Sequence, residues 1–351
     1  MELLRKTVEQ INGLDEEAMR LARERSDNLI KPPGSLGALE EAVVRLAGIY
    51  GEPIPSPGKK VVMVMAGDHG VVAEGVSAFP QEVTPQMVMG FLNGMAGINV
   101  LSRHAGAEVV ITDVGIAAPP IDHPGLNNCR VKNGTDNMAK GPAMSRDEAV
   151  QAIEVGIRLV QEQIDQGARM VATGDMGIGN TTPSTAILAA ISGVPVEEIT
   201  GRGTGLDDRG LKLKQEVIKK ALALNKPDPA DGLDVLAKVG GLEIGALAGV
   251  VLGAAARRIP VVIDGLISGA GALIAKTIAP QSANFMLPSH LSQEPGHRLM
   301  LQQLGLKPLL HLDMRLGEGT GAAIAFLVYD AAMKCHAQMP TFAEAGVTNK
   351  E

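Results

Sequence analysis

The residues best suited to chemistry lie in Gly174–Thr182, which reads Gly-Asp-Met-Gly-Ile-Gly-Asn-Thr-Thr. The stretch follows a short apolar run, Ala168–Thr173, and precedes Pro183–Ser192, which has the composition of a helix start. Between a strand and a helix, glycines let backbone N–H groups approach an anion, and the helix N-terminus adds the positive end of its dipole. Asp175 and Asn180 add polar side chains. An ordinary turn between a strand and a helix has the same composition, so this stretch alone leaves both interpretations open.

Glu318 is a second candidate, because it lies between two glycines after an apolar run. A carboxylate in such a place can act as a base, or it can simply favour the dipole of the helix that follows. His69, His290 and His297 are scattered, and each is interpreted as a structural hydrogen-bonding residue. Glycine loops with carboxylates suit the transfer of a phosphorylated sugar, in which an enzyme positions two groups and moves one proton.

Six apolar runs predict the strands that must position these residues. The runs are 61–65, 109–112, 168–173, 260–263, 284–287 and 309–312. Helices are expected between them, including one over 84–103 with Thr84 as N-cap and one opened by the capping box Ser145–Glu148. Continuous apolar strands that alternate with helices predict an α/β fold with a parallel sheet covered on both faces.

Polar or glycine-rich turns follow all six runs. They contain Asp68-His69, Asp113, Asp175, Asp264, Ser289-His290 and Glu318. In open α/β sheets, ligands bind outside the carboxyl ends of the strands. The convergence of six such turns on one edge therefore favours a binding site over a set of ordinary turns.

Composition excludes several classes of function. The 351 residues carry a net charge of −7 and contain no Trp, with only 2% aromatic residues, which argues against a nucleic-acid-binding surface. Cys129 and Cys335 are too few for a disulfide framework or a four-Cys zinc site. With no signal-peptide pattern after Met1 and no long apolar run, a cytoplasmic protein is expected. There is no Gly-x-x-x-x-Gly-Lys-Ser/Thr loop, no His-Glu-x-x-His and no Cys-x-x-Cys.

Eight segments, in order from residue 31 to residue 321, resemble the family of nicotinate-nucleotide–dimethylbenzimidazole phosphoribosyltransferases. They are Lys31–Gly37, Ala66–Val71, Gly134–Met144, Gly174–Thr182, Gly201–Asp208, Asp264–Gly271, Ser289–His297 and Asp313–Gly321. The resemblance implies a pentosyltransferase of cobalamin biosynthesis. Ribose 5-phosphate would pass from β-nicotinate mononucleotide to 5,6-dimethylbenzimidazole, giving α-ribazole 5′-phosphate and nicotinate.

The same resemblance implies an architecture and an assembly. It predicts a Rossmann-like six-stranded parallel sheet in a large domain over 30–285. A smaller, mainly helical domain would combine 1–29 with 286–351 and carry the glutamate loop. It also implies a homodimer that works on small-molecule substrates without a metal or other cofactor, and without nucleic acid or membrane partners.

The resemblance also assigns roles to residues. Glu318 would be the catalytic base, and Asp175 would be catalytic at a position where some family members carry Glu. The substrate-binding positions would be Gln86, Gly177, Ile178, Gly179, Asn180, Thr181, Gly203, Thr204, Gly205, Lys214, Asp264, Ser289, Leu316 and Gly317. Lys140 is interpreted as a solvated surface charge.

Three other interpretations remain open. A related enzyme could use a purine or a phenolic acceptor with nearly the same motifs. A catalytically silent nucleotide-binding regulator is a second alternative. The third is an NAD-dependent oxidoreductase, since Gly317-x-Gly319-x-x-Ala322 follows an apolar run and opens a helix. The run lies near the end of the chain, which argues against a full dinucleotide-binding unit.

Overall fold

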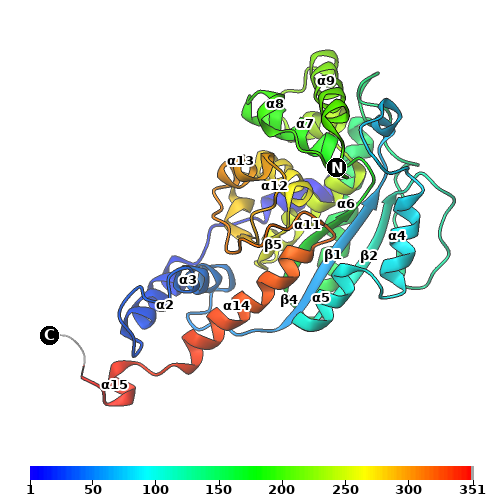
Figure 1. Ribbon diagram of the computed structural model, residues 1–351. Coiled ribbons are helices and arrows are strands. Elements are labelled where there is room, and N and C mark those ends of the chain that lie inside the picture. The colour runs from blue at the N-terminus through cyan, green and yellow to red at the C-terminus, as the bar shows by residue number, and fades with distance from the viewer. Residues whose placement is uncertain (349–351) are drawn as a thin grey trace.

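A six-stranded parallel sheet forms the centre of the computed structural model, which describes residues 1–348 (Figure 1). The strands are β1 (Lys59–Gly67), β2 (Ala107–Gly115), β3 (Leu126–Asn128), β4 (Ala168–Met176), β5 (Val261–Ile263) and β6 (Met286–Pro288). Their order in the sheet is β3-β2-β1-β4-β5-β6, and every neighbouring pair is parallel. The predicted α/β class and six-stranded parallel sheet are confirmed.

The membership of the sheet differs from the prediction at two places. The run 309–312 is not a strand: Leu310 makes only an isolated bridge with His290, and the amides of Leu309 and Leu310 both donate to the carbonyl of Ser289. The sixth strand is instead β3, a three-residue edge strand that pairs with β2. Two of its three residues are asparagines, so no apolar run marks it in the sequence.

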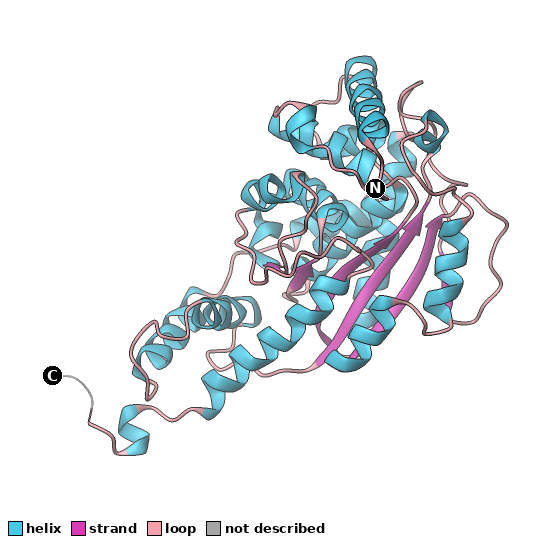
Figure 2. Cartoon of the chain, in the orientation of Figure 1, coloured by secondary structure: helices cyan, strands magenta, loops and turns pink. Residues whose placement is uncertain are grey.

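Helices cover both faces of the sheet, as Figure 2 shows. The helices α4 (Val83–Leu92), α5 (Gly97–Ala105) and α14 (Thr320–Gln338) lie on one face. The helices α6 (Arg146–Asp165), α11 (Leu242–Ala256) and α12 (Leu266–Ile278) lie on the other. Right-handed crossovers explain this division, because the chain runs from β1 outward to β3 and then returns past β1 to β4, β5 and β6.

The remaining helices pack on those six or on one another. They are α1 (Glu2–Glu9), α2 (Glu16–Asn28), α3 (Ala38–Tyr50), α7 (Thr181–Ser192), α8 (Val196–Ile199), α9 (Asp208–Asn225), α10 (Gly232–Val239), α13 (Gly296–Leu304) and α15 (Phe342–Ala345), with 3₁₀ turns η1 (Gly70–Glu74) and η2 (Pro280–Phe285). None of the helices within residues 1–348 is long and apolar enough to cross a membrane. The division into two domains at residues 30 and 285 stays a prediction.

The helix expected over 84–103 is wrong in its extent and its cap. Two helices, α4 and α5, occupy the segment, and the chain turns between them at Gly94, whose φ is +71°. The N-cap of α4 is Glu82, not Thr84. The hydroxyl of Thr84 instead donates to Oδ1 of Asp68 at 2.7 Å and accepts from the amide of Ile178 at 3.1 Å. The Thr84 side chain therefore joins two loops at the carboxyl end of the sheet, where the sequence had predicted that it caps a helix.

Helices α6 and α11 meet along a seam of glycines. A Cβ atom on Gly156 of α6 would lie 1.9 Å from the carbonyl oxygen of Ala246. A Cβ on Gly249 of α11 would lie 2.0 Å from the carbonyl oxygen of Ile153. The two backbones are therefore in direct contact, which only glycine permits. The capping box predicted at the start of α6 is confirmed.

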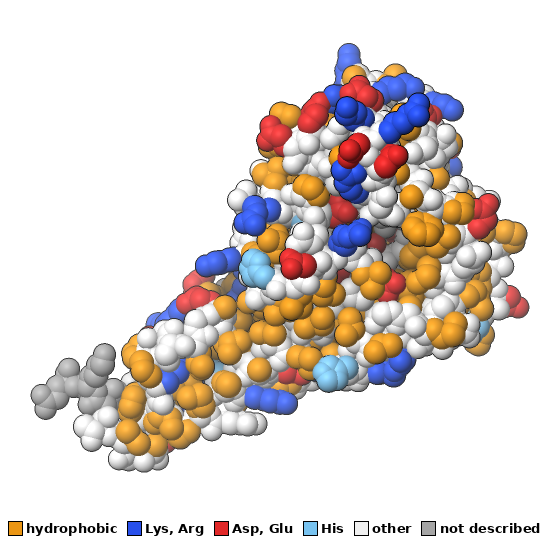
Figure 3. All heavy atoms as spheres, in the orientation of Figure 1, with side chains coloured by type: hydrophobic (Ala, Val, Ile, Leu, Met, Phe, Trp, Pro, Cys, Tyr) orange, Lys and Arg blue, Asp and Glu red, His pale blue; other side chains and the backbone are white. Residues whose placement is uncertain are grey.

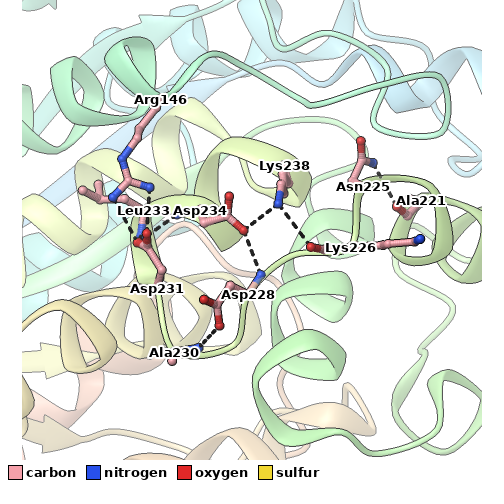
Figure 4. A network of polar contacts seen from close by, with 10 residues as sticks. All are labelled: Arg146, Ala221, Asn225, Lys226, Asp228, Ala230, Asp231, Leu233, Asp234 and Lys238. Atoms are coloured by element: carbon pink, nitrogen blue, oxygen red, sulfur yellow. Dashed lines mark hydrogen bonds and ion pairs between the residues drawn. The ribbon is translucent and has the colours of Figure 1, made fainter.

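A polar network fixes the turn between α9 and α10, as Figure 4 shows. Asp231 caps α10 by accepting from the amide of Asp234, and its carboxylate also pairs with Arg146 of α6 at 2.8 Å. Lys238 pairs with Asp234 at 2.8 Å and donates to the carbonyl of Lys226 at the end of α9. The network ties α9, which carries Lys214, to the helices behind the sheet.

Candidate active site

A cavity of about 440 Å³ lies at the carboxyl ends of the strands. Its floor is the loop after β4, next to the turn that ends β1. The chain leaves β1 toward β2 and leaves β4 toward β5, so the strand order reverses between these neighbours. Open α/β sheets bind ligands at such a switch point. The topology therefore explains why the glycine loop after β4 borders the cavity.

The loop Gly177–Asn180 approaches other backbone very closely. A Cβ on Gly177 would lie 2.1 Å from the carbonyl oxygen of Gly67, and Gly179 has a φ of +89°. Helix α7 then begins at Thr181 without a side-chain cap on its first amides. The amides of Ile178, Asn180 and Thr182 are bonded within the fold, and Pro183 has no N–H, so the amides of Gly179 and Thr181 remain to face the cavity together with the positive end of the helix dipole. This arrangement suits a phosphate group.

A second glycine loop lies against the first. A Cβ on Gly203 would meet Oγ1 of Thr181 at 2.7 Å and Nζ of Lys214 at 3.2 Å. The Lys214 ammonium is fully buried and donates to Oγ1 of Thr181 at 2.7 Å, and burial lowers the pKa of Lys214 to about 8. Arg315, at the cavity wall, donates to the carbonyl of Gly203 at 3.2 Å. Two basic side chains thus lie beside the amides that suit an anion.

Glu318 places a carboxylate on the cavity wall. Its side chain is 5% exposed, and Oε2 accepts from the amide of Ile98, in the first turn of α5, at 3.0 Å. The backbone is in the left-handed region with a φ of +63°, and the flanking Gly317 and Gly319 have φ of +79° and +94°. Burial raises the pKa of Glu318 above its ordinary value, Asp264 adds to that rise, and the bond from Ile98 opposes it. Such a carboxylate is a stronger base than an exposed one.

Asp175 also lines the cavity, and its carboxyl group differs from that of Glu318 in its hydrogen bonds and in how strongly it holds a proton. One of its oxygens accepts from the side-chain amide of Asn180 at 3.0 Å, and the other has no partner within residues 1–348. Burial raises the pKa of Asp175 well above its usual value, and the charges of Asp264, Glu243 and Glu318 raise it further. The Asp175 carboxyl therefore holds its proton to higher pH than an ordinary aspartate does.

Beneath the loops, two fully buried side chains form an ion pair. Nε2 of His69 lies 2.9 Å from a carboxylate oxygen of Glu243. Burial works against charge on His69, but the charge of Glu243 and the bond to it outweigh that effect and raise the pKa of His69. A Cβ on Gly177 would lie 3.3 Å from Nε2 of His69. The His69–Glu243 pair therefore packs directly under the glycine loop that follows β4.

An apolar wall completes the cavity on the side of β1. Phe79, Val83 and Met87 line it, and Leu316 lies on the lining beside Glu318. Phe79 and Leu316 are 51% and 59% exposed, so two apolar side chains of this wall are open to the cavity. A flat aromatic molecule would cover this surface.

The structure brings most of the sequence-predicted residues together. Those that line the cavity are Asp175, Gly177, Ile178, Gly179, Asn180, Thr181, Gly203, Thr204, Leu316, Gly317 and Glu318. Lys214, Asp264 and Ser289 are fully buried behind the lining, and Gly205 borders an adjoining cavity of about 400 Å³. Gln86 is exposed on α4 and is not among the lining residues; its neighbour Met87 is.

Sequence reasoning missed several lining residues. They are Phe79, Val83, Met87, Met176, Gly265, Leu266, Ile267, Ser292, Glu294 and Arg315, together with His290, which was interpreted as structural. The spacing of Val83 and Met87 by four residues is a detectable signal, since both then share one face of a helix. Arg315 lies three residues before Glu318 in the same loop, so its basic charge was also visible.

Comparison with known proteins agrees with this geometry. A family model described as "Phosphoribosyltransferase" matches residues 11–347. A protein from Desulforamulus reducens is 60% identical over 349 residues, covering 99% of each chain, and one from Chloroflexus aggregans is 58% identical over 351 residues, covering 100% of this chain and 99% of the other. Both relatives are named nicotinate-nucleotide–dimethylbenzimidazole phosphoribosyltransferase.

This chain belongs to that phosphoribosyltransferase family. The crystal structure of CobT from Thermus thermophilus has the same fold, with a TM-score of 0.92 and 47% identity, covering 95% of this chain and 100% of that one. The family assignment predicted from the ordered motifs is confirmed, and with it the enzyme class. The NAD-dependent oxidoreductase is accordingly set aside.

Proposed function

We propose that the enzyme transfers ribose 5-phosphate from β-nicotinate mononucleotide to 5,6-dimethylbenzimidazole, giving α-ribazole 5′-phosphate and nicotinate for cobalamin assembly. One observation carries the proposal. The Glu318 carboxylate lies on a cavity that joins the start of helix α7, with the amides of Gly179 and Thr181, to an apolar wall. This arrangement accommodates a phosphate, a sugar and a flat base together, with a carboxylate near the base.

Each part of the cavity then has a role. The donor's phosphate lies on the amides of Gly179 and Thr181 and beside Lys214 and Arg315. The acceptor base lies against Phe79 and Leu316. Binding both substrates in one cavity converts a bimolecular reaction into an effectively unimolecular one.

The bond changes balance with a single proton transfer. One ring nitrogen of the acceptor attacks C1′, and the bond from C1′ to the pyridinium nitrogen breaks. The electron pair of that bond returns to the pyridine ring, which leaves as nicotinate with a neutral ring nitrogen. The acceptor's other nitrogen gives its proton to Glu318. The raised pKa of Glu318 brings its proton affinity closer to that of the group it deprotonates.

Asp175 helps to position the loop that carries Glu318 and the bound substrate. Its carboxyl, held near the floor by Asn180, lies beside the loop that carries Glu318: a Cβ on Gly317 would be 3.3 Å from Oδ2 of Asp175. In its protonated form it can donate a hydrogen bond into the cavity and adds no second negative charge beside the base.

We also propose that the enzyme is a homodimer. Figure 3 shows hydrophobic side chains gathered on the face that carries α14 and α5. Val100 on α5, Leu327 on α14 and Met95 just before α5 are 53%, 37% and 71% exposed. A contiguous exposed apolar face of this kind is typical of a subunit interface. Light scattering of the purified protein tests this: a mass near twice 36.5 kDa supports the dimer, and a single-chain mass contradicts it.

The reaction is tested by a discontinuous chromatographic assay. Purified protein is mixed with β-nicotinate mononucleotide and 5,6-dimethylbenzimidazole without added metal. Matched appearance of nicotinate and a ribosylated benzimidazole phosphate supports the proposal. A panel of purine and phenolic acceptors in the same assay decides between the proposed base and its rivals. No product with any acceptor, from folded protein, would contradict the proposal and support a silent nucleotide-binding protein.

A further inference from the structure

Asp68 and Thr84 form a buried polar pair that the proton transfer described above does not use. Asp68 lies in the turn after β1 and Thr84 in the first turn of α4, and both side chains are fully buried. The Thr84 hydroxyl donates to Oδ1 of Asp68 at 2.7 Å, and Oδ2 of Asp68 accepts from the amide of Ala117 at 2.9 Å. An ionised carboxylate accepts hydrogen bonds and donates none, so Asp68 fixes the direction in which the Thr84 hydroxyl points.

The second partner of the Thr84 hydroxyl is a backbone amide of the glycine loop after β4. The amide of Ile178 donates to Oγ1 of Thr84 at 3.1 Å. The carbonyl of the same peptide group belongs to Gly177, and it accepts from the amide of Asn180 at 3.1 Å. A trans peptide group is planar, with its N–H and C=O pointing in opposite directions, so bonds at both ends fix its orientation.

The peptide group that follows is the one whose amide is left for an anion. The carbonyl of Gly179 accepts from the amide of Thr182 at 3.0 Å, so the peptide group that joins Gly179 to Asn180 is held as well. Between these two held groups lies the one that carries the amide of Gly179. The loop reaches this arrangement with a φ of +89° at Gly179, a conformation that glycine adopts without strain. Thr84 thus occupies the amide of Ile178 and leaves that of Gly179 free to bind an anion.

Helix α4 is a firm support for the Thr84 hydroxyl. Val88 and Phe91, further along the helix, are buried in the core. Val83 and Met87 of the same helix line the cavity as part of its apolar wall. One helix therefore carries both the wall proposed for the acceptor base and the hydroxyl that holds the loop proposed for the donor's phosphate.

We infer that Thr84, oriented by Asp68, is a positioning residue that sets the loop 177–181 for the donor's phosphate and fixes the place of that loop relative to the acceptor wall. The inference rests on the proposed function for the identity of the two ligands. Thr84 and Asp68 are buried behind the cavity lining, so they act on the donor only through the amide of Ile178. Loss of the hydroxyl should therefore impair the donor and leave the acceptor's binding surface in place.

The test compares variants that differ in one hydroxyl. Thr84→Val keeps the shape of the side chain and should lower kcat/KM for β-nicotinate mononucleotide about 10- to 100-fold, as expected for a displacement of about 1 Å. The KM for 5,6-dimethylbenzimidazole should stay within about threefold of wild type, because the helix that carries the wall remains packed in the core. Thr84→Ser retains the hydroxyl and should recover most of the loss. Thr277→Val is the matched control, since it removes a hydroxyl that bonds only to the carbonyl of Leu273 within α12, and it should keep the wild-type constants.

A second readout needs no turnover. β-Nicotinate mononucleotide is titrated calorimetrically into each protein without acceptor, and its Kd should rise about tenfold in Thr84→Val but not in Thr277→Val. If Thr84→Val does not fold, as judged by circular dichroism, Asp68→Asn decides by both readouts. Its amide group cannot accept from both Thr84 and Ala117, so the donor's kcat/KM should fall about 3- to 10-fold, as for one lost hydrogen bond.

The outcomes separate this inference from the proposed function. A donor kcat/KM and a Kd that both stay within about threefold of wild type in Thr84→Val would overturn the positioning role while the reaction itself stands. Equal rises in the KM of donor and acceptor would also overturn it, because they would indicate a general distortion. Thr84→Ser as impaired as Thr84→Val would do the same, since the methyl group and not the hydroxyl would then matter. If the wild-type protein forms no product with any acceptor, the proposed function fails, and titration of inorganic phosphate into the same variants still tests the loop.

Discussion

Replacing Glu318 by Gln separates the proposed chemistry from the fold. The substitution keeps the shape of the side chain and leaves a carbonyl oxygen to accept from the amide of Ile98, now bound at 3.0 Å. It removes the ability to take a proton. A positioned general base contributes about 10²- to 10⁴-fold to rate, so kcat should fall by that factor, or about 3–5 kcal/mol in the barrier.

The free energy of unfolding of Glu318→Gln should equal that of wild type or exceed it. The raised pKa of Glu318 means that the folded state disfavours its charge. Above the ordinary Glu pKa, the unfolded chain loses this proton more readily than the folded chain does, so ionised Glu318 lowers the free energy of unfolding as pH rises toward the folded-state pKa. The Glu318→Gln variant lacks that penalty. Urea unfolding at pH 7 should therefore give an equal or higher midpoint than wild type.

The assay combines turnover with binding. Product formation is followed by chromatography, and the affinity for β-nicotinate mononucleotide is measured by calorimetry, where wild-type and variant values should agree within a few-fold. Glu318→Asp is the matched control, because it keeps the charge but retracts it by one methylene; a displacement of about 1 Å is expected to lower the rate by about 10²-fold. The wild-type rate should also fall at acid pH as Glu318 is protonated, with a limb above the ordinary carboxyl range that Glu318→Gln lacks. Turnover of Glu318→Gln within about threefold of wild type would refute the base assignment.

Three further predictions concern stability. Gly156→Ala forces a methyl group against the carbonyl of Ala246 and should lower the free energy of unfolding by about 1–3 kcal/mol; an unchanged urea midpoint would show that the helices separate freely. Asp175→Asn removes a carboxyl whose pKa is raised on folding, so its stability advantage over wild type should grow as pH rises above about 4, and parallel curves of stability against pH would contradict this. Lys214 has a pKa lowered to about 8 by burial, so the unfolded chain binds its proton more tightly and wild type should gain about 3 kcal/mol between pH 8 and pH 10.5. Lys214→Met should lack that gain, and an equal gain in the variant would argue against a depressed pKa.

The order of apolar runs and glycine turns was sufficient to predict the fold and the floor of the cavity. Gly177–Asn180 combines glycines with polar side chains after a buried strand, and this local pattern is enough to predict a loop that lines a binding site. Two predictions about the sheet were wrong, because the apolar pattern of a segment did not match its strand pairing. The run 309–312 is apolar, but its first amides are bonded outside the sheet, and β3 pairs only because β2 offers it an edge.

The walls of the cavity could not be predicted in the same way. Val83 and Met87 read as ordinary core residues, because nothing local shows that the face they share is open to a cavity. The state of Asp175 depends on Asp264 and Glu243, which are far along the chain and meet it only in the folded molecule. His290 shows the same limit, since it borders the cavity beside Gly265, which lies on another loop.

The glycine seam between α6 and α11 has a consequence for motion. At Gly156 and Gly249 backbone contacts backbone, and the side chains between the helices are small, such as Ala152 and Val160, so α6 and α11 have little room to repack and should move together with the strands they cover. The cavity wall around Phe79 is built differently: Phe79 is half exposed, and the segment around it is bonded to the second glycine loop by the amide of Ala78, which donates to Oγ1 of Thr204. Closure over bound substrates should therefore occur by movement of residues 77–83 toward a stationary half, and amide hydrogen exchange should slow in that segment on binding while α11 stays protected throughout.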